Sequence, residues 1–274
     1  MMTIEEKFQE LNGMEQGAYM PHIYYGDPSE EFSLKQVETL VENGADMIEF
    51  GIPFSDPTAD GPAFQEACER ALGNGITPEQ CIRGLEKLRE GGVEVPIIVT
   101  TYYNIPYVYG IGNFLEKLEE TGVQGIIVPN LPIEEAGDFL ELSRKIGINL
   151  IFQITPNTTE GRMERIVESA SGFIYIVNFE GVTGVRGSVA DSTRNLIGKV
   201  KSLTELPLMA GFGVSEREHA ASLVSAGADG VITGSALGEI YMRKLDNPED
   251  ALSDIGNFAS RIKRGCMEGY RKLD

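Results

Sequence analysis

The chain has 274 residues, of which 42% are hydrophobic, enough to bury one large core, and its formal net charge is −19. Nucleic acids and anionic membranes bind basic surfaces, so this charge argues against both as partners and is expected on a solvated surface. The chain has no signal-like N-terminus, no apolar run of about 18 residues and no CxxC pair among its three cysteines, so we expect a soluble cytoplasmic protein.

The predicted secondary structure follows a repeated junction, in which a polar helical run ends at glycine and a short apolar strand comes next. Glycine suits this position because the residue after a helix often adopts positive φ, which costs glycine little. Residues 2–13 are predicted to form an extra N-terminal helix that closes the bottom of the fold. Eight strands are then predicted, in chain order, at residues 18–25, 43–50, 91–100, 121–128, 146–153, 171–177, 207–210 and 226–233.

The segments between these strands have amphipathic helical periodicity, as in residues 33–41, where Leu34, Val37 and Val41 share one face. Short apolar strands that alternate with such helices predict a parallel sheet covered by helices, and eight units favour closure into a barrel. Residues 1–274 are therefore expected to form one domain of the α/β class, a single (βα)8 TIM barrel.

Two connections from strand to helix are unusually long, at residues 51–63 after the second strand and 178–192 after the sixth. In a (βα)8 barrel both lie on the C-terminal face, where catalytic groups gather. Long loops at this face often act as lids. This face is therefore the predicted location of the functional site.

Glu49 and Asp60 are the candidate catalytic residues of this face. Glu49 ends the second strand, so its side chain is expected in the barrel mouth, where desolvation raises the pKa of a carboxyl and suits it to exchange protons near neutrality. Asp60 follows in a proline-rich loop. Alone, Glu49 can equally be a strand-end residue facing solvent, and Asp60 a turn former. Two carboxylates on one mouth favour different roles, one exchanging a proton and the other stabilising charge.

Glycine-rich elements follow the last three predicted strands, at residues 181–187, 211–215 and 234–235. Glycine lets backbone N–H groups approach an anion closely, and residues 215–218 and Ser235 resemble helix N-termini, the first with a capping box. Each element alone is also a simple turn, but loops after the last strands of such barrels commonly build a phosphate site. Together they predict phosphate binding by local donors, against the unfavourable field of an acidic protein.

Three aromatic residues, Tyr102, Tyr175 and Phe212, lie at or just past the ends of the third, sixth and seventh predicted strands. Rings at these places can form the walls of a site for a flat ligand. Core packing is the commoner reason for such residues, and the sequence pattern alone favours it.

The motif at residues 48–62 (IEFGIPFSDPTADGP) closely resembles the signature of the tryptophan synthase alpha subunit. Residues 26–28, 181–184, 211–214 and 230–236 look like the other landmarks of that family, in the expected order and spacing. The likeness runs from about residue 15 to residue 240.

The resemblance implies a lyase of tryptophan biosynthesis that cleaves indole-3-glycerol phosphate to indole and glyceraldehyde 3-phosphate, a retro-aldol reaction. It implies that Glu49 is the general acid/base, protonating the indole ring at C3 and taking the proton from the glycerol hydroxyl, and that Asp60 binds the indole N–H. Thr183 matches a residue that positions Asp60. The matched phosphate donors are Gly184, Gly213, Gly234 and Ser235, and the matched cavity residues are Tyr102, Tyr175 and Phe212.

The resemblance also implies a partner, because the family works with a beta subunit that carries pyridoxal phosphate and receives indole through a tunnel. An alpha2-beta2 complex is therefore expected. Pro53, Asp56, Asn104 and Pro132 match positions near that interface. No cofactor and no metal are implied for this chain itself.

The chain departs from the family pattern at several positions. His22 stands where an aromatic or apolar residue is usual, and it brings an imidazole near the indole pocket, where packing or hydrogen bonding is favoured over a catalytic role. Asn130 replaces a frequent Asp, and residues 178–180 lack the usual basic residue near the phosphate, for which Arg186 is a candidate substitute. Two alternatives stay open: another phosphate-binding barrel enzyme, and a non-catalytic partner of the beta subunit, against which the two carboxylates argue.

Overall fold

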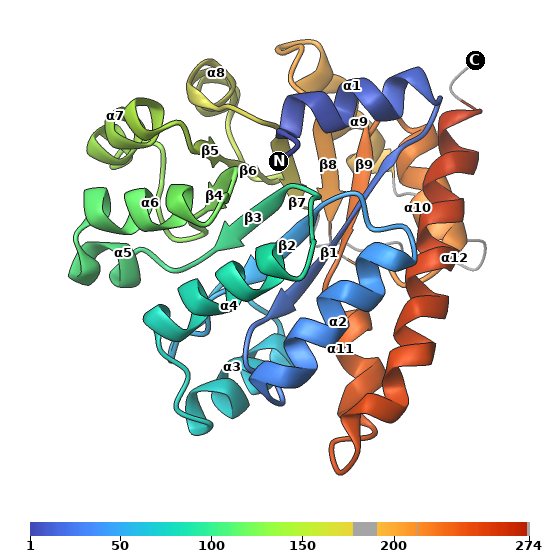
Figure 1. Cartoon of the computed structure of the whole chain (residues 1–274). Coiled ribbons are helices and arrows are strands. Elements are labelled where there is room, and N and C mark those ends of the chain that lie inside the picture. Colours follow the sequence, from blue (N-terminus) through green and yellow to red (C-terminus); the bar gives the residue numbers. More distant parts are fainter. Residues whose placement is uncertain (178–190, 212, 273–274) are drawn as a thin grey trace.

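The computed structural model describes residues 1–177, 191–211 and 213–272 (Figure 1). Its strands are β1 (Ala18–Tyr24), β2 (Ile48–Gly51), β3 (Ile97–Thr100), β4 (Gly125–Ile127), β5 (Asn149–Ile151), β6 (Gln153–Ile154), β7 (Ile174–Val177), β8 (Leu208–Gly211) and β9 (Gly230–Thr233). Its helices are α1 (Ile4–Gly13), α2 (Glu30–Glu42), α3 (Pro62–Gly73), α4 (Pro78–Glu90), α5 (Asn104–Tyr109), α6 (Ile111–Glu120), α7 (Gly137–Ile146), α8 (Glu160–Ser169), α9 (Asp191–Lys201), α10 (Arg217–Ser225), α11 (Ser235–Met242), the 3₁₀ helix η1 (Pro248–Ala251) and α12 (Leu252–Tyr270). None of the described helices combines the length and the apolar character needed to cross a membrane.

The strands form a parallel barrel with the order β5-β4-β3-β2-β1-β9-β8-β7-β6. The two ends of this order are consecutive along the chain and separated only by Phe152, so one segment pairs with β4 on one side and with β7 on the other. The predicted (βα)8 barrel is confirmed. The single strand predicted at residues 146–153 is instead two short strands, because the stagger of a barrel brings its two neighbours alongside the segment at different heights.

Helix α1 closes the end of the barrel where the strands begin (Figure 1). Its start is fixed by a capping box, in which Thr3 accepts a hydrogen bond from the backbone of Glu6 and the Glu6 carboxylate accepts one in return. Its buried face, which carries Ile4, Phe8 and Leu11, packs against inward-facing strand residues. These are Ala18, Met20, Met47, Ile98, Ile127, Ile151, Phe173, Met209 and Ile232. The predicted N-terminal helix and its position are confirmed.

The outer helices bury a second, larger core against the outward faces of the strands. Close packing of α12 on α10 depends on two glycines. A Cβ atom at Gly265 would lie 2.3 Å from the carbonyl oxygen of Arg217, and one at Gly269 would lie 2.5 Å from that of Ala221. Only glycine therefore permits this helix contact.

The start of α10 differs from the prediction. A capping box was expected from Ser215, but the helix begins at Arg217 with Glu216 as its N-cap and without a side-chain cap hydrogen bond. Ser215 lies one residue too early to cap, and its backbone N–H instead donates to Nδ1 of His219 at 3.4 Å. The capping box was a wrong prediction, since one residue of slip removes the geometry that it requires.

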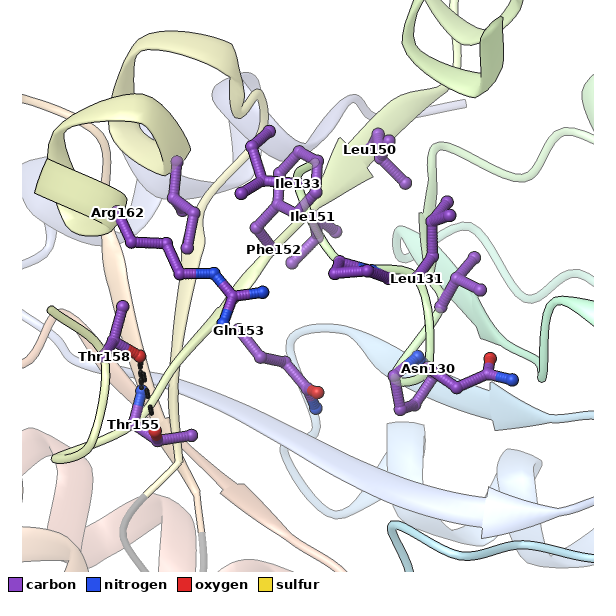
Figure 2. Close-up of a pocket in the computed structure, with 14 residues that line it drawn as sticks. Asn130, Leu131, Ile133, Leu150, Ile151, Phe152, Gln153, Thr155, Thr158 and Arg162 are labelled. Carbon is purple, nitrogen blue, oxygen red and sulfur yellow. Dashed lines mark hydrogen bonds between the residues drawn. The ribbon is translucent and has the colours of Figure 1, made fainter. Parts of the chain in front are cut away.

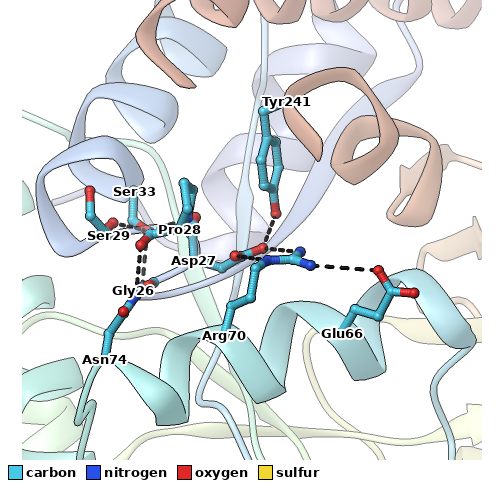
Figure 3. A network of polar contacts seen from close by, with 9 residues as sticks. All are labelled: Gly26, Asp27, Pro28, Ser29, Ser33, Glu66, Arg70, Asn74 and Tyr241. Carbon is cyan, nitrogen blue, oxygen red and sulfur yellow. Dashed lines mark hydrogen bonds and ion pairs between the residues drawn. The ribbon is translucent and has the colours of Figure 1, made fainter. Parts of the chain in front are cut away.

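A buried polar network joins the end of β1 to α3 and α11 (Figure 3). Asp27 is fully buried, and Arg70 of α3 donates to both of its oxygens, Nε to Oδ1 at 2.7 Å and Nη2 to Oδ2 at 3.0 Å. The hydroxyl of Tyr241 in α11 donates to Oδ2 at 2.5 Å. Paired and hydrogen-bonded in this way, a buried carboxylate fixes the elements that hold its partners. The network therefore ties α3, which follows the Asp60 loop, to α11, which follows β9.

Candidate active site

Glu49 lies on β2 and points into the barrel, with 2% of its surface exposed. It stands one inward-facing position beyond Met47, which belongs to the apolar cluster under α1. The hydroxyl of Thr100 on β3 donates to its Oε1 atom at 2.5 Å. On the other side, β1 pairs with β2 so that His22 lies opposite Glu49, and Nδ1 of His22 is 3.4 Å from the same Oε1 atom. The prediction that Glu49 faces the barrel mouth is confirmed.

Burial sets the charge of this pair. Desolvation raises the pKa of Glu49 to about 8, although the hydrogen bond from Thr100 favours the ionised form, and the nearby charge of Asp60 adds to the rise. Desolvation also lowers the pKa of His22 to about 3. At neutral pH the imidazole is therefore uncharged and the carboxyl is mostly protonated. The two groups are close, but they are not an ion pair at that pH.

Asp60 lies in the loop between β2 and α3, and two tyrosines hold it in place. The hydroxyls of Tyr24 and Tyr102 both donate to Oδ2, at 2.8 Å and 2.6 Å. Tyr102 also accepts a hydrogen bond from the backbone of Ala59 at 3.0 Å and stacks on Phe54, so the same ring anchors the loop. Burial raises the pKa of Asp60, and the two hydroxyl donors act in the opposite direction.

The predicted aromatic residues occupy different settings. Tyr102 is almost fully buried, as core packing would require, yet its hydroxyl is committed to Asp60. Tyr175 on β7 packs against the inward-facing cluster and beside Gly211, where a Cβ atom would lie 2.7 Å from its ring. Phe212 lies outside the described residues. A role for these rings in lining a substrate cavity stays a prediction.

The described glycine elements lie at the ends of β8 and β9. Gly213 is exposed and has φ +71°, a conformation that favours glycine. Gly234 is the N-cap of α11 and Ser235 is its exposed first residue, so backbone N–H groups of this helix start are without intrahelical partners. A Cβ atom at Gly234 would lie 2.7 Å from the ring of Phe64, which packs there from α3. The other candidates in this group, Thr183, Gly184 and Arg186, lie outside the described residues, as do residues 178–180.

Three of the four predicted interface residues are at the surface. Asp56, Asn104 and Pro132 are exposed on loops or helix starts that follow β2, β3 and β4, whereas Pro53, near the start of the first of these loops, is buried. Asn130 connects two of them, because it accepts a hydrogen bond from the backbone of Tyr103 at 2.8 Å. Asn130 stands where Asp is frequent in the family, and its side chain still orders the rim.

A cavity of about 340 Å³ lies between the loop after β4 and α8 (Figure 2). Arg162 and Thr158 stand on one side of it, and Asn130 and Leu131 on the other (Figure 2). Arg162 is paired with Glu134 at 2.9 Å. Neither Glu49 nor Asp60 lines this cavity, although Ile151 of the inward-facing cluster does. The described residues also contain no cluster of His, Cys, Asp or Glu side chains suited to hold a metal ion.

Three contributors to the site, Tyr24, Thr100 and Phe64, were not predicted as site residues. The alternation of side chains along a β-strand could have identified two of them. Tyr24 lies two residues after His22, and Thr100 pairs in register with Gly51, which lies two residues after Glu49. Phe64 reaches the mouth from a helix, with its ring centroid 4.5 Å from that of His22. Strand periodicity gives no signal for a contact of that kind.

The fold defines the class of the protein as a (βα)8 barrel, with the carboxyl groups of Glu49 and Asp60 at the carboxyl ends of its strands, the face where enzymes of this fold hold their catalytic groups. The family model for the tryptophan synthase alpha chain matches residues 8–267. The chain is 43% identical over 262 residues to the tryptophan synthase alpha chain of Methanosarcina barkeri, with 96% of each chain covered. The chain belongs to the tryptophan synthase alpha chain family.

Solved structures agree with this assignment. The tryptophan synthase alpha chain of Legionella pneumophila superimposes with a TM-score of 0.88 at 32% identity, over 97% of each chain. A chain of the tryptophan synthase complex from Pyrococcus furiosus superimposes with a TM-score of 0.82 at 35% identity, over 90% of this chain and 98% of that one. The resemblance inferred from the motif at residues 48–62 is thereby confirmed.

Proposed function

We propose that this chain cleaves indole-3-glycerol phosphate to indole and glyceraldehyde 3-phosphate, with Glu49 and Asp60 as its catalytic residues. The observation that carries the proposal is the buried Glu49 carboxyl, whose pKa is raised to about 8, in the same barrel mouth as Asp60. A carboxyl with a pKa near the working pH both delivers and removes protons efficiently. The membership of the chain in the tryptophan synthase alpha chain family supports the choice of reaction.

The proposed reaction begins with transfer of the Glu49 proton to C3 of the indole ring, which leaves a positive charge on the ring nitrogen. Asp60 accepts a hydrogen bond from the ring N–H and stabilises that charge. Glu49, now a carboxylate, removes the proton from the glycerol hydroxyl on the carbon next to the ring. The bond between ring and side chain then breaks, its electrons neutralise the ring as indole, and the hydroxyl carbon becomes the aldehyde of glyceraldehyde 3-phosphate. One proton is given and one is taken back, so Glu49 ends as it began.

We propose that the substrate phosphate lies at the ends of β8 and β9, against the start of α11. The helix start at Ser235 and the exposed backbone at Gly213 support this position, because unpaired N–H groups attract an anion. Gly234 is proposed as a further phosphate donor, and its lack of a Cβ atom also leaves room for the ring of Phe64. Gly184, and Thr183 as a residue that positions Asp60, complete the proposed site from outside the described residues. Tyr102, Tyr175 and Phe212 are proposed to line the indole cavity.

We propose a tryptophan synthase beta subunit as the partner, in an alpha2-beta2 complex whose pyridoxal phosphate belongs to the beta subunit alone. Solved tryptophan synthase complexes among the structural relatives support such a partner. The exposed rim residues Asp56, Asn104 and Pro132 are the proposed contacts, with Pro53 shaping the loop from below. Tyr107 and Val108 of α5, 67% and 85% exposed, add apolar surface beside Asn104. The whole chain, residues 1–274, is proposed to act as one cytoplasmic domain.

An indole-release assay tests this function. Purified chain is incubated with indole-3-glycerol phosphate, alone and with a beta subunit, and indole is measured as it appears. We expect indole in both cases and faster release in the complex. Absence of indole in both, together with turnover of a different sugar phosphate, would assign the chain to another class of phosphate-binding barrel enzyme.

A further inference from the structure

His22 has a fixed position beside the proposed proton carrier. It pairs in register with Glu49 across β1 and β2, and its Nδ1 atom lies 3.4 Å from Oε1 of the carboxyl. The two residues are 6% and 2% exposed, so the contact is shielded from bulk solvent. An imidazole in such a place either fills space or acts on the carboxyl.

The packing around His22 sets the direction of its ring. The ring centroids of Tyr24 and Phe64 lie 5.0 Å and 4.5 Å from that of the imidazole. At Gly51 a Cβ atom would lie 2.9 Å from Nε2, so glycine at this position leaves room for the ring edge. With its faces and one edge occupied, the ring keeps Nδ1 toward Glu49.

The two oxygens of Glu49 have different surroundings. Oε1 accepts the hydroxyl hydrogen bond of Thr100 and is also the atom nearest to His22. Among the described residues, Oε2 of Glu49 and Nε2 of His22 have no hydrogen-bond partner. A carboxyl that exchanges a proton needs one oxygen that is free to carry it, and here that oxygen is Oε2.

We propose that His22 is a positioning residue for Glu49: its neutral Nδ1–H and the Thr100 hydroxyl hold Oε1, which leaves Oε2 to give its proton to the substrate and take one back. The inference rests on the proposed function of Glu49. Oε1 accepts both donors whether or not Oε2 carries the proton, so the carboxyl keeps its orientation through the reaction. The Nδ1–H donor also favours the ionised form of Glu49 and so counteracts part of the effect of burial on its pKa.

The other titratable groups around His22 and Glu49 do not obscure the effect of the Nδ1–H donor on the pKa of Glu49. They are Tyr24, Asp60, Cys68, Tyr102 and Tyr175. Burial raises the pKa of the four tyrosine and cysteine side chains above their ordinary values, so they stay neutral between pH 5 and 9. Asp60 is the one charge among them that Glu49 senses, and Asp60→Asn removes it as a control.

The first test needs no substitution. The chain contains two histidines, so nitrogen NMR of histidine-labelled protein resolves His22 from His219. We expect His22 to be neutral with its proton on Nδ1 at pH 7, and its nitrogen shifts to change as Glu49 ionises near pH 8. A proton on Nε2 instead, with shifts that ignore the titration of Glu49, would overturn the proposal.

The second test compares variants. His22→Phe keeps an aromatic ring but removes the donor, so the pKa of Glu49, followed by carbon NMR of its carboxyl, should rise by about one unit. The high-pH limb of kcat for indole release should move upward by the same amount. His22→Asn, whose amide N–H can replace Nδ1–H, should bring the pKa of Glu49 most of the way back to its wild-type value. Tyr25→Phe, in the outer core just after β1, should leave that pKa unchanged.

The readouts separate failure of this inference from failure of the proposed function. If the wild-type chain releases no indole, the function fails, while the two NMR titrations still decide whether His22 acts on Glu49. If indole is released but the titration of Glu49 is the same in His22→Phe as in the wild type, His22 only fills space.

Discussion

The lower and upper halves of the barrel interior are built from the same strands, yet they differ in chemistry. In six places around the barrel, a lower residue is followed two positions later by an upper one that faces the same interior. The pairs are Met20 and His22, Met47 and Glu49, Ile98 and Thr100, Phe173 and Tyr175, Met209 and Gly211, and Ile232 and Gly234. All the lower members are apolar and pack under α1, whereas the upper members are polar or glycine.

The difference shows which half of the interior stabilises the folded barrel and which half contains a group that destabilises it. Burial of the lower side chains against Ile4, Phe8 and Leu11 favours folding by the hydrophobic effect. Burial of the Glu49 carboxyl in the upper half disfavours its ionised form and so opposes folding at high pH. Substitutions in the two halves should therefore act on different measurements.

The largest expected effect is on turnover, in the upper half. Glu49→Gln keeps the shape of the side chain but cannot exchange a proton, so we expect kcat for indole release to fall by about a thousandfold or more. Substrate affinity, measured by calorimetry, should be nearly unchanged because the phosphate site is separate. Turnover close to that of the wild type would contradict the assignment.

Next in size is a loss of stability in the lower half. Phe8→Ala empties space under the barrel, and its free energy of unfolding should fall by about 3 kcal/mol or more. Denaturant unfolding measures this loss, with the exposed Gln9→Ala on the same helix as the matched control. At a temperature where the variant is folded, kcat should stay within about twofold of the wild type. A tenfold change in kcat would require the activation free energy to change by about 1.4 kcal/mol. A large loss of kcat would show that the two halves are not separable.

Asp60→Asn is expected to reduce kcat by about a hundredfold, because a neutral amide stabilises the charged ring nitrogen less well than a carboxylate does. The amide oxygen can still accept the hydroxyl hydrogen bonds of Tyr24 and Tyr102, so the loop should keep its place. A thermal melt that matches the wild type would separate this loss from unfolding. A variant that melts early would instead assign Asp60 a structural role.

The smallest effect is a gain in stability, again from Glu49→Gln. The folded chain raises the pKa of Glu49 from 4.5 to about 8, so it binds this proton more tightly than the unfolded chain does. Stability therefore falls as pH rises from 4.5 toward 8, and the variant escapes this loss. We expect its free energy of unfolding to exceed that of the wild type by on the order of 2 kcal/mol at pH 6, with no such gain below pH 4.5. An equal difference at both pH values would contradict the burial argument.

The sequence was sufficient for the architecture of the lower half and for the position of Glu49. Short apolar strands, amphipathic helices and glycine junctions predicted the barrel, and residues 2–13 were predicted to form a helix that closes its bottom. The same patterns placed Glu49 in the mouth. They could not show that β5 and β6 divide one predicted strand, because the stagger of neighbouring strands is set by the closed barrel as a whole.

The upper half was predicted less completely, since its contacts join distant segments. Tyr24 and Tyr102 meet on Asp60 from β1 and from the end of β3, and Phe64 approaches His22 from α3. Each contact depends on side-chain directions at elements far apart in the chain. Ser215 shows that a local pattern can also fail. The capping box was predicted at Ser215, but the N-cap of α10 is the next residue, Glu216.

The pH dependence of kcat for indole release by the wild-type chain tests the central claim most directly. If Glu49 is the buried acid that starts the reaction, the rate should be maintained through neutrality and fall as pH rises through about 8, where this carboxyl loses its proton. A rate that instead rises with a pKa near 4.5 and stays constant above pH 8 would contradict the account, because the catalytic group would then be an ordinary, solvated carboxylate.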